Sequence, residues 1–266
     1  MKAFIIYIRD SYLSLGAVAD CLLSIVNNKI DLDLELFPAT TPDTLEHDWQ
    51  KIFPYTHWKD LWEPKVLDID KRKGNGIVRH KSFNTLWLER RISCFISHYK
   101  LWKISAELNS QILILEQDAF FIKKFSFAEV NNSFYQDVLN LASLSQSVDN
   151  NIEAEALHAE IAKDYKQENK NLVKCFDINY LPTNSAYIVK PNVIDKVNEW
   201  IERTSTVVQN DNLLAQACKI QTCYPYFTSV TKISKSINQH LPSSVSITSK
   251  NDLYKYLKNS YNKLKT

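Results

Sequence analysis

The opening of the chain contains the pattern that most restricts its fold. Residues 3–8 form an apolar run that is too short for a helix and predicts a buried strand. Ser11 can cap a following helix whose apolar positions extend from Leu15 to Val26, and residues 31–37 alternate acidic with apolar side chains. This alternation predicts a second strand with one exposed face. Strand, helix and strand in this order form a βαβ unit, and such units build parallel sheets, so we expect an α/β fold.

The glycine content limits how such a fold can bind a nucleotide. The chain has only three glycines in 266 residues, namely Gly16, Gly74 and Gly76. Phosphate-binding loops of the Walker and dinucleotide-binding types need several glycines at fixed spacing, so both types are excluded. Hydrophobic residues make up 45% of the chain, which excludes intrinsic disorder. The 32 basic and 30 acidic residues nearly cancel, which excludes a histone-like polycation.

The cysteines and the opening residues indicate a cellular setting. The five cysteines include no Cys-x-x-Cys pair and no Cys/His cluster, so neither a zinc site nor a disulfide framework is expected. Reduced thiols of this kind fit the cytosol. The first apolar run reaches Arg9 and Asp10 too soon for a signal peptide, and no apolar run approaches the ~18 residues of a membrane span. We therefore expect a soluble cytoplasmic protein.

The remaining segments extend the α/β pattern without an internal repeat or a linker. We expect helices at residues 86–108, 134–170, 191–202, 211–218 and 252–265, and strands at residues 112–115, 172–176, 186–189 and 220–227. Residues 38–85 show no clear period, and a long loop inside a compact domain is usually functional. The sequence thus predicts a single domain over residues 1–266, with a central, mostly parallel sheet and flanking helices.

The sharpest chemical feature is the end of the strand predicted at residues 112–115. Glu116 and Asp118 follow it two positions apart, and residues i and i+2 of an extended segment point to the same side. Ligands bind at the carboxyl ends of strands in open α/β sheets. Two carboxylates there suit a hard cation such as Mg²⁺ or Mn²⁺, which prefers oxygen ligands and bridges substrate phosphates. The alternative is that these acidic residues end the strand only because they are solvated there.

Several segments, in order along the chain, carry a resemblance to a known family. They are residues 91–103 with the motif Ser-His-x-x-Leu-Trp, the apolar strand and acidic end at 112–118, residues 183–189, residues 209–214, and the pair Tyr224-Pro225. Together they resemble glycosyltransferase family 25, which includes lipooligosaccharide and collagen galactosyltransferases. The resemblance extends over roughly residues 86–230. The N-terminal third looks closer to family-25-like proteins of large tailed phages.

The resemblance implies a GT-A-like (Rossmann-like) fold and the transfer of a sugar from a nucleotide-sugar donor, first of all a UDP-sugar. It makes Glu116 and Asp118 a version of the Asp-x-Asp metal motif. Asp118 would then hold Mn²⁺ or Mg²⁺, and Glu116 would contact the ribose, or the metal through water. A metal there neutralises the charge that develops on the departing diphosphate. The chain departs from the family at Gln117, in the middle of the acidic triplet, and before Asp211, where Pro-Val is missing.

The same resemblance suggests further site residues. Asp211 is the candidate base that deprotonates the acceptor hydroxyl, and direct attack with one base would invert the anomeric centre. Its alternative role is that of an ordinary helix N-cap. The candidate donor-binding residues are Ser97, His98, Thr183 and Asn184. For His98 the alternative is a packed histidine that holds a neighbouring backbone.

Basic and aromatic side chains in the long loop are candidates for acceptor or phosphate contacts. They are Lys71, Arg72, Lys73, Arg79, Trp58 and Trp62. Charge runs are usually solvated faces, and at least one tryptophan of the group Trp49, Trp58 and Trp62 is expected to belong to the core. Residues 250–266 form a basic amphipathic helix that could bind a membrane surface or nucleic acid, or pack against the body.

The sequence leaves three alternatives open: two classes of acceptor for a transferase, and a role without catalysis. The bacterial members of the family point to a lipooligosaccharide or surface glycan, reached at the inner membrane face. The phage-like N-terminal third points instead to a hydroxymethylated base in DNA, flipped from the duplex into the site. The altered acidic triplet also suits a member that binds carbohydrate or nucleic acid without catalysis. No obligate protein partner is evident from the sequence.

Overall fold

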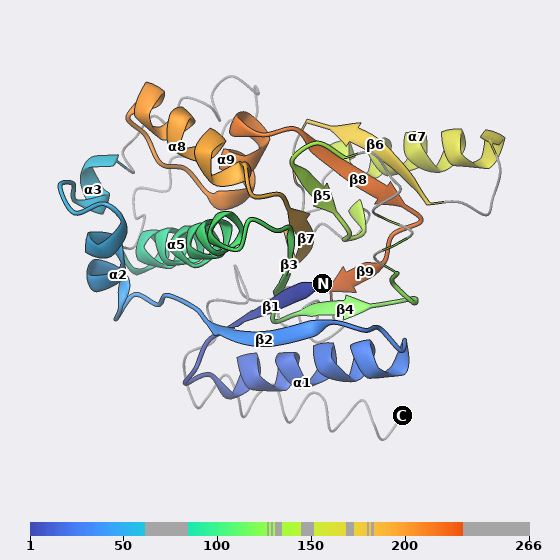
Figure 1. The fold of residues 1–266 in the computed structure, drawn as a ribbon, viewed down its shortest axis with the longest axis horizontal. Helices are drawn as coiled ribbons and strands as arrows, with labels where there is room; N and C mark the ends of the chain where they lie inside the picture. The colour runs from blue at the N-terminus through green and yellow to red at the C-terminus, as the bar shows by residue number, and fades with distance from the viewer. Residues whose placement is uncertain are drawn as a thin grey trace.

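A seven-stranded sheet forms the centre of the molecule (Figure 1). The computed structural model describes residues 1–61, 85–126, 128, 130, 135–144, 152–168, 173–179, 181 and 184–230. Within these residues the strand order is β2-β1-β3-β7-β5-β8-β6. The strands are β1 (Lys2–Tyr7), β2 (Asp33–Pro38), β3 (Ile112–Glu116), β5 (Val138–Asn140), β6 (Lys174–Ile178), β7 (Ala186–Val189) and β8 (Ile220–Tyr224).

The direction of the strands confirms the expected, mostly parallel sheet. β1 pairs in parallel with β2 and with β3, and β5 pairs in parallel with β8. β7 is antiparallel to both β3 and β5, and β6 is antiparallel to β8. Five strands therefore share one direction and end at one edge of the sheet, while β6 and β7 run the other way. A separate ribbon pairs β4 (Ala119–Phe121) with β9 (Thr228–Val230).

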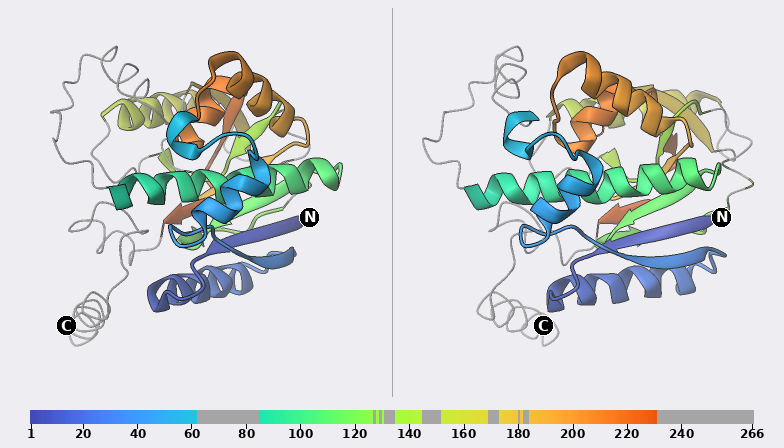
Figure 2. Two further views of the ribbon diagram at one scale, coloured as in Figure 1. Left: turned by 90° about the vertical axis from the view of Figure 1, so that its left-hand side faces the viewer. Right: turned by 60° about the vertical axis from the view of Figure 1, so that its left-hand side comes forward.

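Helices cover both faces of the central sheet (Figure 2). They are α1 (Tyr12–Asn27), α2 (Leu45–Ile52), α3 (Trp58–Leu61), α5 (Thr85–Glu107), α7 (Ile152–Glu168), α8 (Val193–Thr204) and α9 (Asn210–Ala217). Alternation along the strands divides the core between the two faces. In β1, Phe4 and Ile6 belong to the cluster formed with α5, α8 and α9, whereas Ala3 and Ile5 pack with α1.

The predicted βαβ opening is confirmed. Ser11 is the N-cap of α1, and its hydroxyl accepts a hydrogen bond from the backbone N–H of Ser14 at 3.2 Å. A side-chain oxygen at this position satisfies one of the N–H groups that a helix leaves without an internal partner. The helix then returns the chain to β2, which pairs with β1 and is the outermost strand on that side of the sheet.

Two predictions about local structure are wrong. The part of residues 38–85 that the structure describes is not a structureless loop, because it contains α2 and α3. Leu45 and Trp49 lie four residues apart and are both buried, so one short apolar face is enough to fix α2. Residues 134–170 are not one helix either, since β5 lies within them. All three residues of β5 are buried, so this strand has no alternation that a pattern search could detect.

Other expected elements lie where the sequence places them or outside the described residues. The helix expected at 86–108 is α5, and the predicted strand at 220–227 corresponds to β8, which ends at Tyr224. The basic segment 71–81, Trp62, Thr183 and the terminal segment 250–266 lie outside the described residues. Among the described helices, none is both long and apolar enough to span a membrane.

Candidate active site

The carboxyl end of β3 forms the floor of the candidate site. β3 is buried from Ile112 to Leu115 and emerges at Glu116, whose side chain is 24% exposed. The backbone N–H of Glu116 donates to the carbonyl of Ser185 at 2.7 Å, directly before β7 begins. Glu116 is therefore held at the edge where the parallel strands end, which is where α/β sheets bind ligands.

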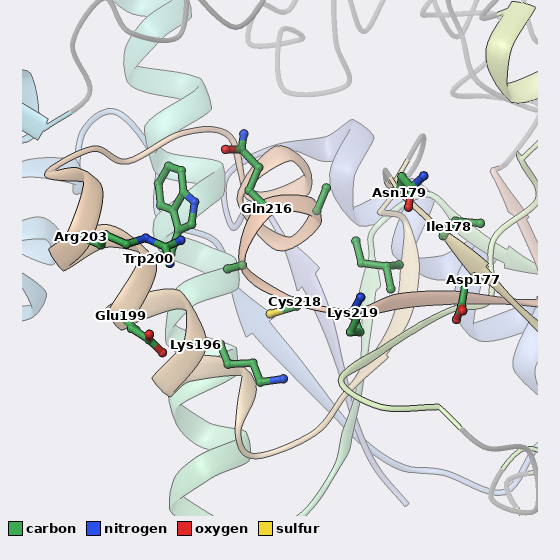
Figure 3. Close-up of a pocket in the computed structure, with 13 residues that line it drawn as sticks. Asp177, Ile178, Asn179, Lys196, Glu199, Trp200, Arg203, Gln216, Cys218 and Lys219 are labelled. Carbon is green, nitrogen blue, oxygen red and sulfur yellow. The ribbon is translucent and has the colours of Figure 1, made fainter.

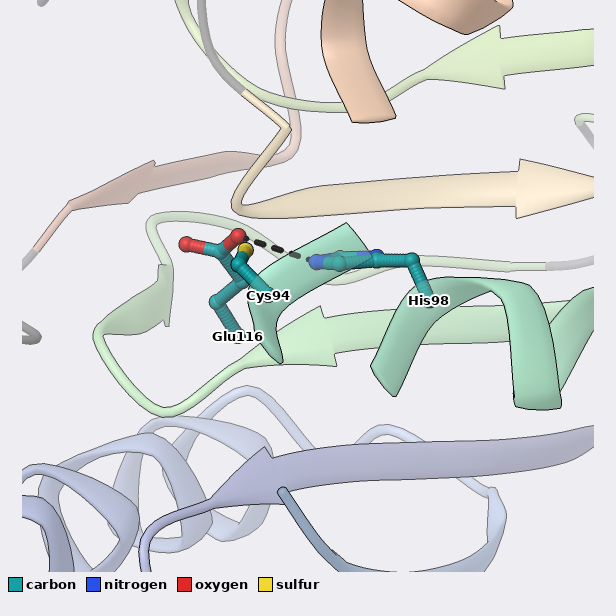
Figure 4. A group of neighbouring side chains, drawn as sticks. All are labelled: Cys94, His98 and Glu116. Carbon is teal, nitrogen blue, oxygen red and sulfur yellow. Dashed lines mark hydrogen bonds and ion pairs between the residues drawn. The ribbon is translucent and has the colours of Figure 1, made fainter. Parts of the chain in front are cut away.

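A cysteine and a histidine of α5 meet Glu116 there (Figure 4). Ligand atoms of Cys94, His98 and Glu116 all lie within 4.8 Å of one another. Cys94 and His98 are four residues apart, and this spacing places both on one face of the helix. The expectation that the chain has no Cys/His cluster is thus wrong, and the helical spacing was the signal for it. All five cysteines are free, as expected.

His98 connects Glu116 to two further side chains that sequence reasoning did not select as site residues. The Nε2 atom of His98 lies 3.2 Å from Glu116 Oε1, and its Nδ1 atom lies 2.6 Å from Tyr187 Oη. Tyr187 Oη also accepts a hydrogen bond from Trp102 Nε1 at 3.1 Å. His98, Trp102 and Tyr187 are buried. The spacing of His98 and Trp102 in α5 pointed to a shared face, but nothing local linked them to β7.

Asp211 belongs to the same electrostatic environment. Burial raises the pKa of its carboxyl, and the negative charge of Glu116 raises it further, whereas the N–H of Asn212 and the Arg91 guanidinium lower it. Burial also raises the pKa of Cys94 well above its usual value, and the charges of Glu116 and Asp211 act in the same direction. Cys94 is therefore a neutral thiol beside two carboxylates.

The first turn of α9 contains Asp211 without using it as the cap. Gln209 is the N-cap of this helix, and Asp211 Oδ1 accepts a hydrogen bond from the N–H of Asn212 at 2.8 Å. The neighbouring Asn210 is buried, and its Oδ1 lies 3.8 Å from Cys94 Sγ. The capping role considered from the sequence is therefore wrong, and a chemical role for Asp211 stays open.

A comparison with protein families identifies the family of this chain. The sequence model of glycosyltransferase family 25, described as an LPS biosynthesis protein, matches residues 23–214. This stretch is more than half of the chain. The chain belongs to glycosyltransferase family 25. The matched stretch contains Cys94, His98, Glu116 and Asp211. A comparison with curated proteins finds no significant match.

Solved glycosyltransferases resemble this family 25 chain only distantly. The galactosyltransferase LgtC, in complex with donor and acceptor sugar analogues, is 12% identical with a TM-score of 0.38, over 84% of this chain and 73% of that chain. Mouse xyloside xylosyltransferase 1 in its apo form is 6% identical with a TM-score of 0.40, over 81% of each chain.

The acidic motif of this family 25 chain is divided by the end of the strand. β3 ends at Glu116, and Gln117 and Asp118 form the turn that leads to β4. Gln117 accepts a hydrogen bond from the Ser14 hydroxyl of α1. Burial raises the pKa of Cys21 in α1 to about 12, and the charge of Asp118 contributes to this shift. Glu116 thus contacts His98 of α5, while the charge of Asp118 acts on Cys21 of α1.

Three further predicted site residues, Ser97, Asn184 and Trp58, lie within the described part of the structure. Ser97 is buried, donates to the carbonyl of Ser93 at 2.8 Å and accepts from the N–H of Thr40 at 2.9 Å. Asn184 directly precedes Ser185, the backbone partner of Glu116. Trp58 is 4% exposed and belongs to the core, as Trp49 does, which confirms the expectation of a core tryptophan. Donor binding by Ser97 and Asn184 and acceptor contact by Trp58 stay predictions.

A cavity of about 580 Å³ lies at the opposite edge of the sheet (Figure 3). The end of β6, the helices α8 and α9 and the start of β8 line it, with Trp200, Arg203 and Lys219 among the lining residues. β8 begins at this edge and ends at the edge of Glu116, because it runs in the same direction as β3. None of the predicted site residues lines this cavity.

Proposed function

We propose that this family 25 glycosyltransferase moves a sugar from a UDP-sugar to a hydroxyl of a lipooligosaccharide or similar surface glycan. The supporting observation is that Asp211 of α9 lies within electrostatic reach of Glu116, which ends β3 at the carboxyl edge of the sheet. One carboxylate can then serve the donor while the other serves the acceptor. The LPS biosynthesis description of the family supports a glycan acceptor.

Asp211 is the base in this proposal. It takes the proton of the acceptor hydroxyl as the oxygen attacks the anomeric carbon, and the nucleoside diphosphate leaves from the opposite face, which inverts the anomeric centre. A carboxyl whose pKa is raised holds the proton more strongly than a solvated one, so burial and Glu116 improve Asp211 as a base.

Glu116 and Asp118 are the residues we propose for Mn²⁺ or Mg²⁺. The donor set fits such a cation, since carboxylate oxygens are its preferred ligands and Glu116 is partly exposed at the strand end. Only Oε1 of Glu116 engages His98, which leaves Oε2 to face the cation or the donor ribose. A bound cation supplies neutralisation of the charge on the departing diphosphate.

The test is sugar transfer by the pure protein and by Asp211→Asn. Release of UDP from a panel of UDP-sugars is measured with Mn²⁺ present, together with transfer of labelled sugar to purified lipooligosaccharide. We expect Asp211→Asn to lower kcat by ~10²–10⁴-fold, the usual contribution of a positioned base. An undiminished kcat in this variant would exclude Asp211 as the base.

Asp195→Asn is the matched control, because Asp195 is an exposed carboxylate in the first turn of α8. It should keep the wild-type rate. Duplex DNA with hydroxymethylated bases is the second acceptor in the same assay, and transfer to DNA in place of lipooligosaccharide would contradict the proposed glycan acceptor.

A further inference from the structure

Four side chains from three elements form one continuous line of hydrogen bonds. Trp102 and His98 come from α5, Tyr187 from β7 and Glu116 from the end of β3. The line runs from Trp102 Nε1 to Tyr187 Oη at 3.1 Å, on to His98 Nδ1 at 2.6 Å, and from His98 Nε2 to Glu116 Oε1 at 3.2 Å. We refer to these four residues as the His98 chain.

The donors and acceptors of the His98 chain fit only one direction. An indole N–H is a donor and never an acceptor, so Tyr187 Oη must accept from Trp102. Tyr187 has a single hydroxyl proton, and its other partner is His98 Nδ1. That proton is therefore donated to Nδ1, and the neutral imidazole bears its own proton on Nε2, which donates to Glu116.

The opposite direction fails at both ends. With the proton on Nδ1, Tyr187 would accept from both His98 and Trp102, and its own buried proton would have no acceptor among the contacts described. The lone pair of Nε2 would also face the carboxylate oxygen of Glu116 at 3.2 Å, which is repulsive.

We propose that the His98 chain fixes the Nε2–H tautomer of His98 and thereby positions the carboxylate of Glu116 for the donor. His98 is a positioning residue, since it acts through Glu116. A neutral donor orients Oε1 without cancelling the negative charge of Glu116, so Oε2 keeps its attraction for a cation. This inference rests on the proposed function only for what Glu116 binds, and the tautomer itself does not depend on it.

The His98 chain also decides how the cluster of Cys94, His98 and Glu116 behaves. Its ligand atoms lie close enough for a metal such as Zn²⁺, which favours thiolate and imidazole. A metal on Nε2 would need that nitrogen without its proton, and would force the unfavourable tautomer. The two states exclude each other, and in our proposal the protonated state is the resting one.

The tautomer is measured directly by long-range ¹H–¹⁵N correlation spectra of the ¹⁵N-labelled protein at neutral pH. The chain has six histidines, so the His98 signals are assigned by their loss in His98→Gln. We expect the pattern of the Nε2–H tautomer, unchanged on addition of Zn²⁺. The Nδ1–H pattern, or a Zn²⁺-induced change that Cys94→Ser abolishes, would overturn the proposal.

Tyr187→Phe tests the effect on Glu116 because it removes the hydroxyl that holds Nδ1 of His98. Glu116 still favours the Nε2–H tautomer, but the imidazole loses the partner that fixes its orientation. We therefore expect UDP binding in the presence of Mn²⁺ that is weaker by ~10-fold or more, as for other partners that orient metal ligands. Tyr99→Phe is the control, since Tyr99 is a buried tyrosine of α5 that donates to Asn198 instead.

The two readouts separate the failure of this inference from the failure of the proposed function. If the wild type has the Nε2–H tautomer but Tyr187→Phe binds UDP as tightly as the wild type, the His98 chain does not position Glu116. If the protein binds UDP and transfers sugar while His98 is in the Nδ1–H form, the proposed function stands and the direction assigned to the His98 chain is refuted. An Nε2–H His98 in a protein that binds no UDP would sustain the tautomer and contradict the function.

Discussion

At the scale of single residues, the raised pKa of Asp211 links the stability of the fold to pH. Burial and the charge of Glu116 raise its pKa above the usual value, so the folded chain holds this proton more tightly than the unfolded chain. Stability attributable to the group therefore falls as pH rises from its ordinary pKa through the raised folded value. At neutral pH the charged carboxylate therefore lowers the stability of the fold, a cost that the proposed role of Asp211 as a base would explain.

We expect Asp211→Asn to be more stable than the wild type at neutral pH, because the amide resembles the uncharged carboxyl. The difference should shrink below the ordinary pKa of aspartate, where both chains are neutral at this position. Thermal denaturation across this pH range measures it. A variant that is less stable than the wild type at neutral pH would show that the charge of Asp211 is stabilised by its neighbours, and Asp195→Asn should show little pH-dependent difference.

At the scale of elements, the buried carboxylate of Asp137 connects the sheet to α8. Asp137 directly precedes β5 and is 1% exposed. It accepts hydrogen bonds from Lys196 Nζ at 2.7 and 2.8 Å, from Asn192 Nδ2 at 2.9 Å and from the N–H of Lys219 at 2.8 Å. Burial opposes ionisation of Asp137, but these hydrogen bonds outweigh it, and the pKa is lowered. One carboxylate thus joins β5, α8 and the start of β8.

We expect Asp137→Ala to lower the free energy of unfolding by roughly 3 kcal/mol, since it leaves buried donors without their charged acceptor. In the wild type this stabilisation is present above the ordinary aspartate pKa and is lost as pH falls through the lowered folded value. Urea denaturation at neutral and acidic pH measures both effects. Asp177→Ala is the control, because Asp177 is exposed in β6, and a loss of similar size there would refute the argument.

At the scale of the whole molecule, strand direction gathers the site. β1, β3, β5 and β8 end at one edge, and β7 begins there beside Glu116. α5 contributes Cys94 and His98 to this edge, while α9 contributes Asp211. The cavity beside Trp200 lies at the opposite edge, so the two regions are separate surfaces of one sheet.

This arrangement predicts that UDP with Mn²⁺ raises the thermal stability of the wild type. A ligand at a hundredfold excess over its Kd stabilises a folded protein by about 2.7 kcal/mol. We expect no such shift with Glu116→Ala, and an unchanged shift with Glu199→Ala, which alters the opposite cavity. A UDP shift that disappears with Glu199→Ala and persists with Glu116→Ala would place the nucleotide in that cavity.

The sequence by itself determined the elements whose patterns are local. The βαβ opening, the long helix that became α5, and the buried strand ending in Glu116 each follow from periodicity and capping within a few residues. The motifs of the family also placed Glu116, His98 and Asp211 among the candidates. The sequence did not predict β5, because a short strand that is buried on both faces has no alternating pattern.

Only the tertiary structure decided which of these residues meet. Tyr187 contacts His98 across 89 positions of sequence, and the charge of Glu116 raises the pKa of Asp211, which lies in α9. Such contacts depend on strand order and on which face each helix covers, and neither is encoded in a local period. Glu116 and Asp118 likewise have different neighbours, because β3 ends at Glu116 and Asp118 lies in the turn that follows. Glu116 contacts His98 of α5, and the charge of Asp118 acts on Cys21 of α1.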